Sequence, residues 1–261
     1  MKIGIYDIDV VNLSIQERFE IYKSVGFTHV GFYFDNSYLK ENENYLQLIE
    51  IANKCGLNIN QLHLDYKNSN MLSINEDNDF IKYIEIKIDE AINYGVNQLV
   101  LHASKGSDAP LISPYSIKRL KKLSKKLVKY NVELCFENVR DNTNLDKIMS
   151  LNLENINMCY DSGHAHCYSN EKEIINKYKD KITATHLHDN FTSDDHYKIG
   201  EGSIEWDAIS SLLNETRRKM DYLESFPPRG SELSRKQFTD FVKDLYDAYN
   251  NFFKEYDQSD K

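Results

Sequence analysis

Short apolar runs alternate with longer segments of helical periodicity along the whole chain. The runs, which are predicted strands, cover residues 2–6, 29–34, 57–65, 98–104, 132–139, 156–163, 182–189 and 221–226. The helical segments between them cover residues 14–24, 39–55, 77–94, 114–130, 144–150, 171–180, 206–219 and 234–253. This strict alternation is typical of parallel βα units.

Signals at the segment boundaries support the alternation. Ser14 and Glu17 have the spacing of a capping box, and Gly95 follows a predicted helix end. Eight βα units in 261 residues fit an α/β protein with a closed (β/α)8 TIM barrel, and no Gly/Ser/Pro-rich linker divides it, so residues 1–261 are predicted to form a single domain. A doubly wound sheet is the alternative fold, but no nucleotide-binding glycine motif follows the first strand.

Composition and charge narrow the class of protein. No apolar run approaches the roughly 20 residues of a membrane helix, and the start MKIGIYDID lacks the pattern of a signal peptide, so we expect a soluble, cytoplasmic chain without a membrane partner. Its four cysteines show no CxxC spacing, which favours reduced thiols. The net charge of -9 argues against a nucleic-acid partner. The basic segment 116–130 has leucines at helical spacing, which places its lysines on an outer face.

Proton- and metal-binding side chains gather where the predicted strands end. Seven of the eight histidines lie at or just beyond such an end, and only His29 begins a strand. The groups at these ends are His63, His102, Glu137, Asp161, His164, His186, His188, Asp194, His196 and Glu224. In a parallel barrel the carboxyl ends of all strands meet at one mouth, where active sites lie. The sequence therefore predicts one polar cluster at that mouth.

The residue types in this cluster point to a divalent cation. His186 and His188 share a face of their strand, so both point into the barrel. Converging carboxylates and imidazoles need protons or metal ions between them, and a mixed nitrogen and oxygen ligand set suits zinc, manganese, cobalt or iron. Taken alone, a strand-end histidine more often packs than binds metal, and Asp194 and His196 could equally be solvated loop residues. For His166, simple packing is the favoured interpretation.

The motifs at these ends resemble the xylose isomerase-like TIM barrel superfamily, which includes sugar phosphate isomerases and epimerases and the endonuclease IV-like AP endonuclease family 2. They are LHLD, LVLHAS, CFEN, CYDSGHAH, THLHDN, DDHYKIGEGSIEW and YLESF, and they span nearly the whole chain. One departure is Gly31, which stands where the superfamily often has an acidic residue.

In the epimerase branch, the resemblance implies one divalent metal ion, zinc or manganese, held by Glu137, Asp161, His186 and Glu224. The ion would clamp adjacent oxygens of a sugar or sugar phosphate and stabilise an enediolate. Glu137 and Glu224 would be the catalytic base and acid, and His188 would orient the sugar. This metal-dependent isomerase or epimerase, acting on a small-molecule sugar, is the favoured function.

In the endonuclease IV branch, the resemblance implies a trinuclear zinc site for phosphodiester or small phosphoester hydrolysis. All nine ligand positions are filled, by His63, His102, Glu137, Asp161, His164, His186, Asp194, His196 and Glu224. Lys105 and Arg229 are candidate phosphate contacts near the mouth. The acidic net charge and the short loops make this hydrolase the second choice. A barrel that serves as a binding or regulatory protein is the third choice. A homo-oligomer is compatible with any of these functions.

Overall fold

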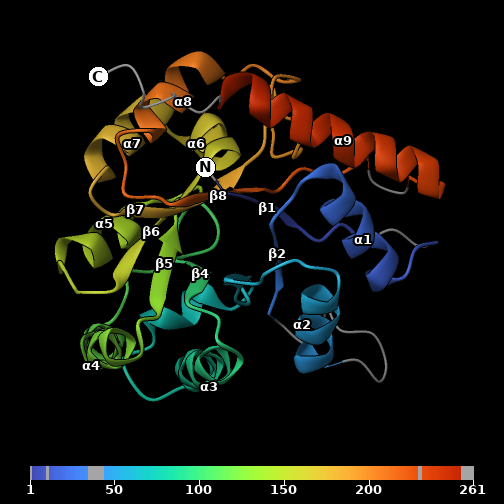
Figure 1. Ribbon diagram of the computed structural model, residues 1–261. Helices are drawn as coiled ribbons and strands as arrows, with labels where there is room; N and C mark the ends of the chain where they lie inside the picture. The colour runs from blue at the N-terminus through green and yellow to red at the C-terminus, as the bar shows by residue number, and fades with distance from the viewer. Residues whose placement is uncertain (1, 10–11, 35–43, 229–230, 254–261) are drawn as a thin grey trace, which may run out of the picture.

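The structure, a computed structural model, describes residues 2–9, 12–34, 44–228 and 231–253. In this part of the chain eight parallel strands close into a barrel in sequence order, with helices around the outside (Figure 1). The strands are β1 (Lys2–Tyr6), β2 (His29–Tyr33), β3 (Gln61–His63), β4 (Gln98–His102), β5 (Glu133–Glu137), β6 (Ile156–Asp161), β7 (Ile182–Leu187) and β8 (Met220–Leu223). The predicted TIM barrel is confirmed, and each strand lies within a predicted range or, for β8, overlaps it.

The helices follow the predicted order with some changes at their ends. They are α1 (Ile15–Val25), α2 (Tyr45–Lys54), α3 (Asp79–Tyr94), α4 (Pro114–Tyr130), α5 (Thr143–Ser150), α6 (Ser162–Tyr168), α7 (Glu171–Tyr178), α8 (Trp206–Leu213) and α9 (Arg235–Phe252), with a short 3-10 helix η1 (Ser69–Ser73). Residues 39–43 of the predicted helix 39–55 lie outside the described residues. The predicted helix 206–219 is shorter in the structure, because α8 ends at Leu213.

The residues that the sequence marks as helix caps form caps in the structure. The Ser14 side chain accepts from the backbone N–H of Glu17, and the Glu17 carboxylate accepts from the backbone N–H of Ser14, so α1 begins with a complete capping box. Gly95 closes α3 with φ of 73°, in the left-handed region that glycine tolerates best.

Helix α6 was not predicted, because the expected strand ran on to residue 163. The strand ends at Asp161, whose side chain accepts from the backbone N–H of His164 at 2.6 Å and so caps a new helix. One aspartate is thus both the last residue of β6 and the N-cap of α6. His164 therefore sits in the first turn of a helix beside the barrel mouth.

Side chains inside the barrel are more polar than the branched apolar layers usual in this fold. The main hydrophobic core lies between the barrel and its helices, whereas a separate small cluster of Val100, Cys135, Cys159 and Ala184 fills the barrel's waist. Above this waist the inward positions carry the histidines and carboxylates. Within the described ranges, none of the helices combines the length and apolar character needed to cross a bilayer.

Candidate metal centre

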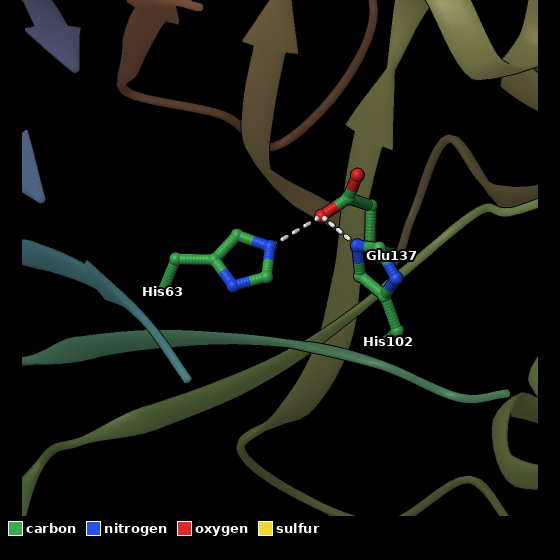
Figure 2. A group of neighbouring side chains, drawn as sticks. All are labelled: His63, His102 and Glu137. Carbon is green, nitrogen blue, oxygen red and sulfur yellow. Dashed lines mark hydrogen bonds and ion pairs between the residues drawn. The ribbon is translucent and has the colours of Figure 1, made fainter. Parts of the chain in front are cut away.

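Glu137, the last residue of β5, lies at the centre of the polar cluster (Figure 2). Its Oε2 atom is 3.2 Å from Nε2 of His63 and 3.4 Å from Nε2 of His102. Its Oε1 atom is 3.0 Å from Nδ1 of His164. The three imidazoles come from β3, β4 and α6, and the parallel register, in which His102 pairs with Glu137, brings the strand ends to one level.

Electrostatics at this carboxylate favour its charged form. Burial alone would raise the pKa of Glu137, but the charges of His102 and His186 outweigh this effect and hold the pKa well below its usual range. The side chain is almost fully shielded from solvent, with a relative exposure of 1%. A buried carboxylate of this kind needs a compensating positive charge.

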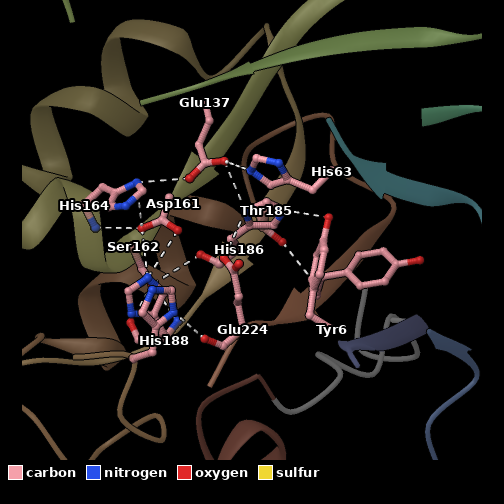
Figure 3. Close-up of polar contacts among 12 residues, drawn as sticks. Tyr6, His63, Glu137, Asp161, Ser162, His164, Thr185, His186, His188 and Glu224 are labelled. Atoms are coloured by element: carbon pink, nitrogen blue, oxygen red, sulfur yellow. Dashed lines mark hydrogen bonds and ion pairs between the residues drawn. The ribbon is translucent and has the colours of Figure 1, made fainter. Parts of the chain in front are cut away.

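Glu224, which follows β8, faces Glu137 across His186 (Figure 3). The Nδ1 atom of His186 is 3.3 Å from Oε2 of Glu137 and 3.2 Å from Oε2 of Glu224. The other carboxylate oxygen of Glu224 accepts a hydrogen bond of 2.7 Å from the hydroxyl of Tyr33. Burial would lower the pKa of His186, but acidic groups around the ring, led by Cys159 and Tyr6, raise it well above its usual value.

Asp161 joins this cluster from β6. The Nε2 atom of His188 lies 3.1 Å from its Oδ1 and 3.2 Å from its Oδ2. The His188 ring lies directly over the backbone of Gly163, where a Cβ atom would be only 1.9 Å from Cε1 of the ring. Glycine is therefore required at position 163 for this placement of His188.

The loop after β7 supplies Asp194 and His196. The His196 ring stacks on His188 with ring centres 3.8 Å apart. Asp194 bridges to His164 at 3.5 Å and to His196 at 3.4 Å. Burial would raise the pKa of Asp194, but its hydrogen bond with His164 and the nearby imidazole charges lower this pKa to about 2.

Backbone carbonyls orient several of the imidazoles. Nδ1 of His63 lies 2.7 Å from the carbonyl of Leu64, and Nδ1 of His196 lies 2.7 Å from the carbonyl of Glu224. When a carbonyl accepts from one ring nitrogen, the opposite nitrogen is left as a lone pair that can bind a metal ion. In both rings that opposite atom, Nε2, faces a carboxylate of the cluster.

These residues fit a bound cation. Nδ1 of His186 is fully buried and makes no hydrogen bond, although two carboxylate oxygens surround it. Among the residues that the structure describes, five groups of three side chains each offer ligand atoms within 4.8 Å of one another: His63/His102/Glu137, Glu137/Cys159/His186, His188/Asp194/His196, Glu137/Asp161/His164 and Asp161/His186/Glu224. A divalent cation would satisfy both the orphaned nitrogen and the buried carboxylates.

Comparison with known proteins agrees with the fold. The family model described as "Xylose isomerase-like TIM barrel" matches residues 19–243. The chain belongs to this family. A segment of 63 residues is also 38% identical to an uncharacterised protein, y4fM, of Sinorhizobium fredii, but this match covers only 23% of the chain and 20% of that protein's length.

Several solved structures superpose on nearly the entire chain. An L-ribulose 3-epimerase matches with a TM-score of 0.74 and 15% identity over 97% of this chain and 95% of that one. A D-allulose 3-epimerase from Methylomonas sp., in complex with D-allulose, matches with a TM-score of 0.75 and 11% identity over 97% of each chain. A xylose isomerase domain-containing protein of Salmonella typhimurium LT2 matches at 0.73 and 18%, over 94% and 96%. At these identities the likeness establishes the fold.

Within this xylose isomerase-like barrel, all nine residues predicted as metal ligands meet at the mouth, as the contacts above describe. His188 also lies inside the cluster rather than at its edge. Lys105 lies at the rim, with Nζ 5.9 Å from the ring centre of Tyr66. Arg229 lies outside the described residues. His166 contacts Glu171 and Ser203, away from the cluster, in agreement with its interpretation as a structural residue.

The departure at Gly31 has a structural reason. A Cβ at this position would lie 3.2 Å from the Tyr222 ring and 3.3 Å from the Tyr6 ring, so the glycine makes room for two tyrosines inside the barrel. Two residues further along β2, on the same face, Tyr33 supplies the polar contact to Glu224. Sequence analysis missed Tyr33, although the alternation of β2 pointed it inward.

Asp189 is a second residue that sequence analysis missed. Its fully buried carboxylate accepts from the backbone N–H groups of Asn190, Gly200 and Ile204 and from the indole N–H of Trp206. These bonds fasten the loop that carries Asp194 and His196 against the end of β7. Asp189 of the HLHDN motif therefore joins the GEGSIEW motif and shapes the loop between them.

Proposed function

We propose that this protein is a divalent-metal-dependent sugar or sugar-phosphate isomerase or epimerase. Its ion would be held by Glu137, Asp161, His186 and Glu224. The observation that carries the proposal is the buried Nδ1 of His186, which has no hydrogen bond and lies within 3.3 Å of two opposed glutamates. When bound, a divalent ion polarises the carbonyl and hydroxyl oxygens of a ketose and lowers the pKa of the adjacent carbon-bound proton.

The two glutamates are suited to moving that proton. Glu137 and Glu224 approach from opposite sides of His186, so a sugar between them would present one face of its reacting carbon to each. Both are held as carboxylates, because burial, which would raise their pKa values, is outweighed by the imidazole charges that lower them. One would remove the proton and the other would return it. Tyr33 fixes the free oxygen of Glu224.

A ketose is the substrate class that we propose first. The solved structures that superpose include 3-epimerases named for L-ribulose, D-tagatose and D-psicose. We propose His188 as a contact to the sugar, because its ring lies beside Asp161 within the cluster. Lys105 would contact a phosphate group, since its ammonium lies over Tyr66, whose ring centre is 5.0 Å from that of His102.

The test measures proton exchange directly. Protein loaded with Mn²⁺ or Zn²⁺ is incubated in D₂O with a panel of ketoses and ketose phosphates, and exchange of the carbon-bound hydrogen is followed by NMR. We expect exchange and a new epimer with the unmodified protein, and loss of about a thousandfold or more in Glu137→Gln and Glu224→Gln. The matched control is Glu201→Gln, an exposed glutamate near the loop that carries Asp194, which should retain full activity. Equal rates in all variants would refute the proposal.

A second candidate function is phosphoester hydrolysis by three zinc ions. It is favoured by two other groups of candidate ligands: His63/His102/Glu137, which shares Glu137 with the four-residue set, and His188/Asp194/His196, whose His188 contacts Asp161. Elemental analysis separates the two: about one ion per chain supports proton transfer, and about three support hydrolysis. Zinc-dependent cleavage of DNA with an abasic site, or of a simple phosphodiester, without any exchange of ketose hydrogen would make hydrolysis the function.

A further inference from the structure

We propose that two buried glutamines and a glutamate, Gln61, Gln98 and Glu133, form a hydrogen-bonded chain that sets the tautomer of His186 and so presents its Nδ1 atom to the metal. The inference rests on the proposed function, because His186 is a ligand there. It assigns a positioning role to residues on the side of the barrel opposite the mouth, which contact neither the ion nor a sugar.

The chain begins at the ring nitrogen that faces away from the carboxylates. Nε2 of His186 lies 3.1 Å from Oε1 of Gln61 and 3.2 Å from the hydroxyl of Tyr6. The Tyr6 hydroxyl itself donates to the same Gln61 oxygen at 3.0 Å. Gln61 is fully buried and lies two residues before His63 on β3, so both side chains point into the barrel.

The chain continues through a second amide toward the amino-terminal end of the barrel. Nε2 of Gln61 donates to Oε1 of Gln98 at 2.7 Å. Nε2 of Gln98 then donates to Oε2 of Glu133 at 3.0 Å and to the backbone carbonyl of Thr183 at 3.2 Å. The orientation of one amide therefore determines the orientation of the next, because each amide oxygen accepts a hydrogen bond on one side and each amide nitrogen donates one on the other.

Two acceptors at the far end forbid the reverse arrangement. A carboxylate and a backbone carbonyl only accept hydrogen bonds, so the Gln98 atom that faces both Glu133 and Thr183 must be its NH₂ group. The Gln98 oxygen therefore faces Gln61, and the Gln61 oxygen faces His186. A rotated Gln61 would turn its carbonyl oxygen toward the Gln98 oxygen and so leave two acceptors in contact.

This polarity decides where the proton of His186 resides. An acceptor at Nε2 requires Nε2–H, which leaves the lone pair on Nδ1, the atom between Glu137 and Glu224. Groups that orient a metal-binding imidazole in this way typically change metal affinity by 10- to 100-fold when they are removed. Glu133 anchors the chain where it lines a pocket of about 210 Å³ with Arg217 and Lys219, at the end of the barrel away from the mouth.

The experiment measures metal affinity rather than turnover. Co²⁺ is titrated into the metal-free protein against a chromophoric chelator, with thermal melting of every variant as a check of folding. Gln61→Met keeps the side-chain length but has no amide acceptor, and we expect it to bind Co²⁺ about 10- to 100-fold more weakly. Gln61→Glu disturbs the contact with Gln98 more but keeps an acceptor for Nε2–H, so it should retain affinity within about threefold.

Two further variants complete the design. Tyr222→Phe is the matched control: Tyr222 pairs with His186 in the sheet, but the hydroxyl that is removed hydrogen-bonds Asn60 rather than His186, and the affinity of the variant should equal that of the unmodified protein. Glu133→Gln replaces the anchoring carboxylate with an amide that can donate as well as accept, which leaves the Thr183 carbonyl to hold the Gln98 orientation, and we expect binding about two- to threefold weaker. If Gln61→Met does not fold, Glu133→Gln carries the test, because Glu133 is partly exposed.

A spectroscopic readout accompanies the titration. In Zn²⁺-loaded protein with ¹⁵N-labelled histidine, the hydrogen-bonded Nε2–H of His186 should give a downfield proton resonance, assigned by its absence in His186→Gln. This resonance should be lost or shifted upfield in Gln61→Met. Unchanged Co²⁺ affinity and an unchanged resonance in Gln61→Met would overturn this inference but not the proposed function. An unmodified protein that binds no ion would overturn the proposed function as well.

Discussion

Replacing Gly163 by alanine is a stringent test of the site's geometry. Gly163 lies in α6, so its backbone accepts alanine, and alanine in a helix is usually stabilising by about 0.5–1 kcal/mol. Here the added Cβ would lie 1.9 Å from Cε1 and 2.4 Å from Nδ1 of His188, whereas ordinary contacts begin at 3.4 Å. The ring would have to retreat by about 1.5 Å, the difference between 3.4 and 1.9 Å.

That retreat is blocked by the ring's other contacts. His196 stacks on His188 with ring centres 3.8 Å apart, and Asp161 binds its Nε2 at 3.1 Å. Overpacking costs about 1–3 kcal/mol and a lost hydrogen bond to a charged group costs about 1.5–3 kcal/mol, against the small helical gain. We therefore expect a net loss of about 3 kcal/mol, which for a chain of this size lowers the melting temperature by about 6–12 °C.

Thermal melting of metal-free protein, followed by circular dichroism, measures this loss. The control is the same substitution in a His188→Ala background, where the imidazole is gone and Gly163→Ala should be neutral or stabilising by up to about 1 kcal/mol. A Gly163→Ala protein with the same melting temperature as the unmodified protein would refute the reasoning. So would an equal loss in both backgrounds, because the strain would then not come from His188.

Three further predictions concern the groups around the cluster. In Tyr33→Phe, Glu224 loses the donor to its Oε1, and we expect hydrogen exchange into ketose to slow by about tenfold and unfolding to become easier by about 1.5–3 kcal/mol; an unchanged rate would show that this bond does not position Glu224. In Asp189→Asn, the NH₂ group must face two of the four donors, whichever oxygen it replaces, so unfolding should become easier by about 2–4 kcal/mol and the fluorescence of Trp206 should change; a stable variant with native fluorescence would contradict this role. In metal-free protein the raised pKa values of His164 and His186 contribute stability that is fully present below pH 6.5 and is lost as the pH rises through the raised values. The lowered pKa values of Glu137 and Glu224 contribute stability that is present above pH 4.5 and is lost as the pH falls. Added Zn²⁺ should therefore raise the melting temperature more above pH 6.5 than below it, as scans between about pH 5 and about pH 9 would measure, and an increment independent of pH would argue against these imidazoles as ligands.

The convergence of the site was predictable because topology alone enforces it. Closed parallel strands bring His63, Glu137 and Glu224 to the same rim, whatever the side chains in between. Strand alternation likewise predicts that His186 and His188 point inward. The hydrophobic periodicity of the chain therefore predicted both the fold and most of the side chains that lie at the mouth.

Individual hydrogen bonds were not predictable from topology and periodicity. The cap at Asp161 that starts α6, the carbonyl that orients His196 and the four bonds to Asp189 depend on the local path of the backbone. Hydrophobic periodicity carries no information about these bonds, because a polar residue after a strand has the same pattern whether it caps a helix or binds a ligand. Gly163 is a further case, since only the position of a distant imidazole explains it.

If the proposed function holds, burial would couple ion binding to proton release at this site. Glu137, Asp161 and Glu224 are exposed by only 1%, 0% and 4%, so their charges are compensated by neighbours rather than by water. Without a cation, the raised pKa values of His164 and His186 indicate that protons on these rings supply that compensation. On the proposed function, a divalent ion held by His186 would displace a proton from the ring, and the carboxylates would then compensate the charge of the ion. On the proposed function, the same exchange would free Glu137 and Glu224 from imidazolium partners, so that either carboxylate could accept the proton from carbon.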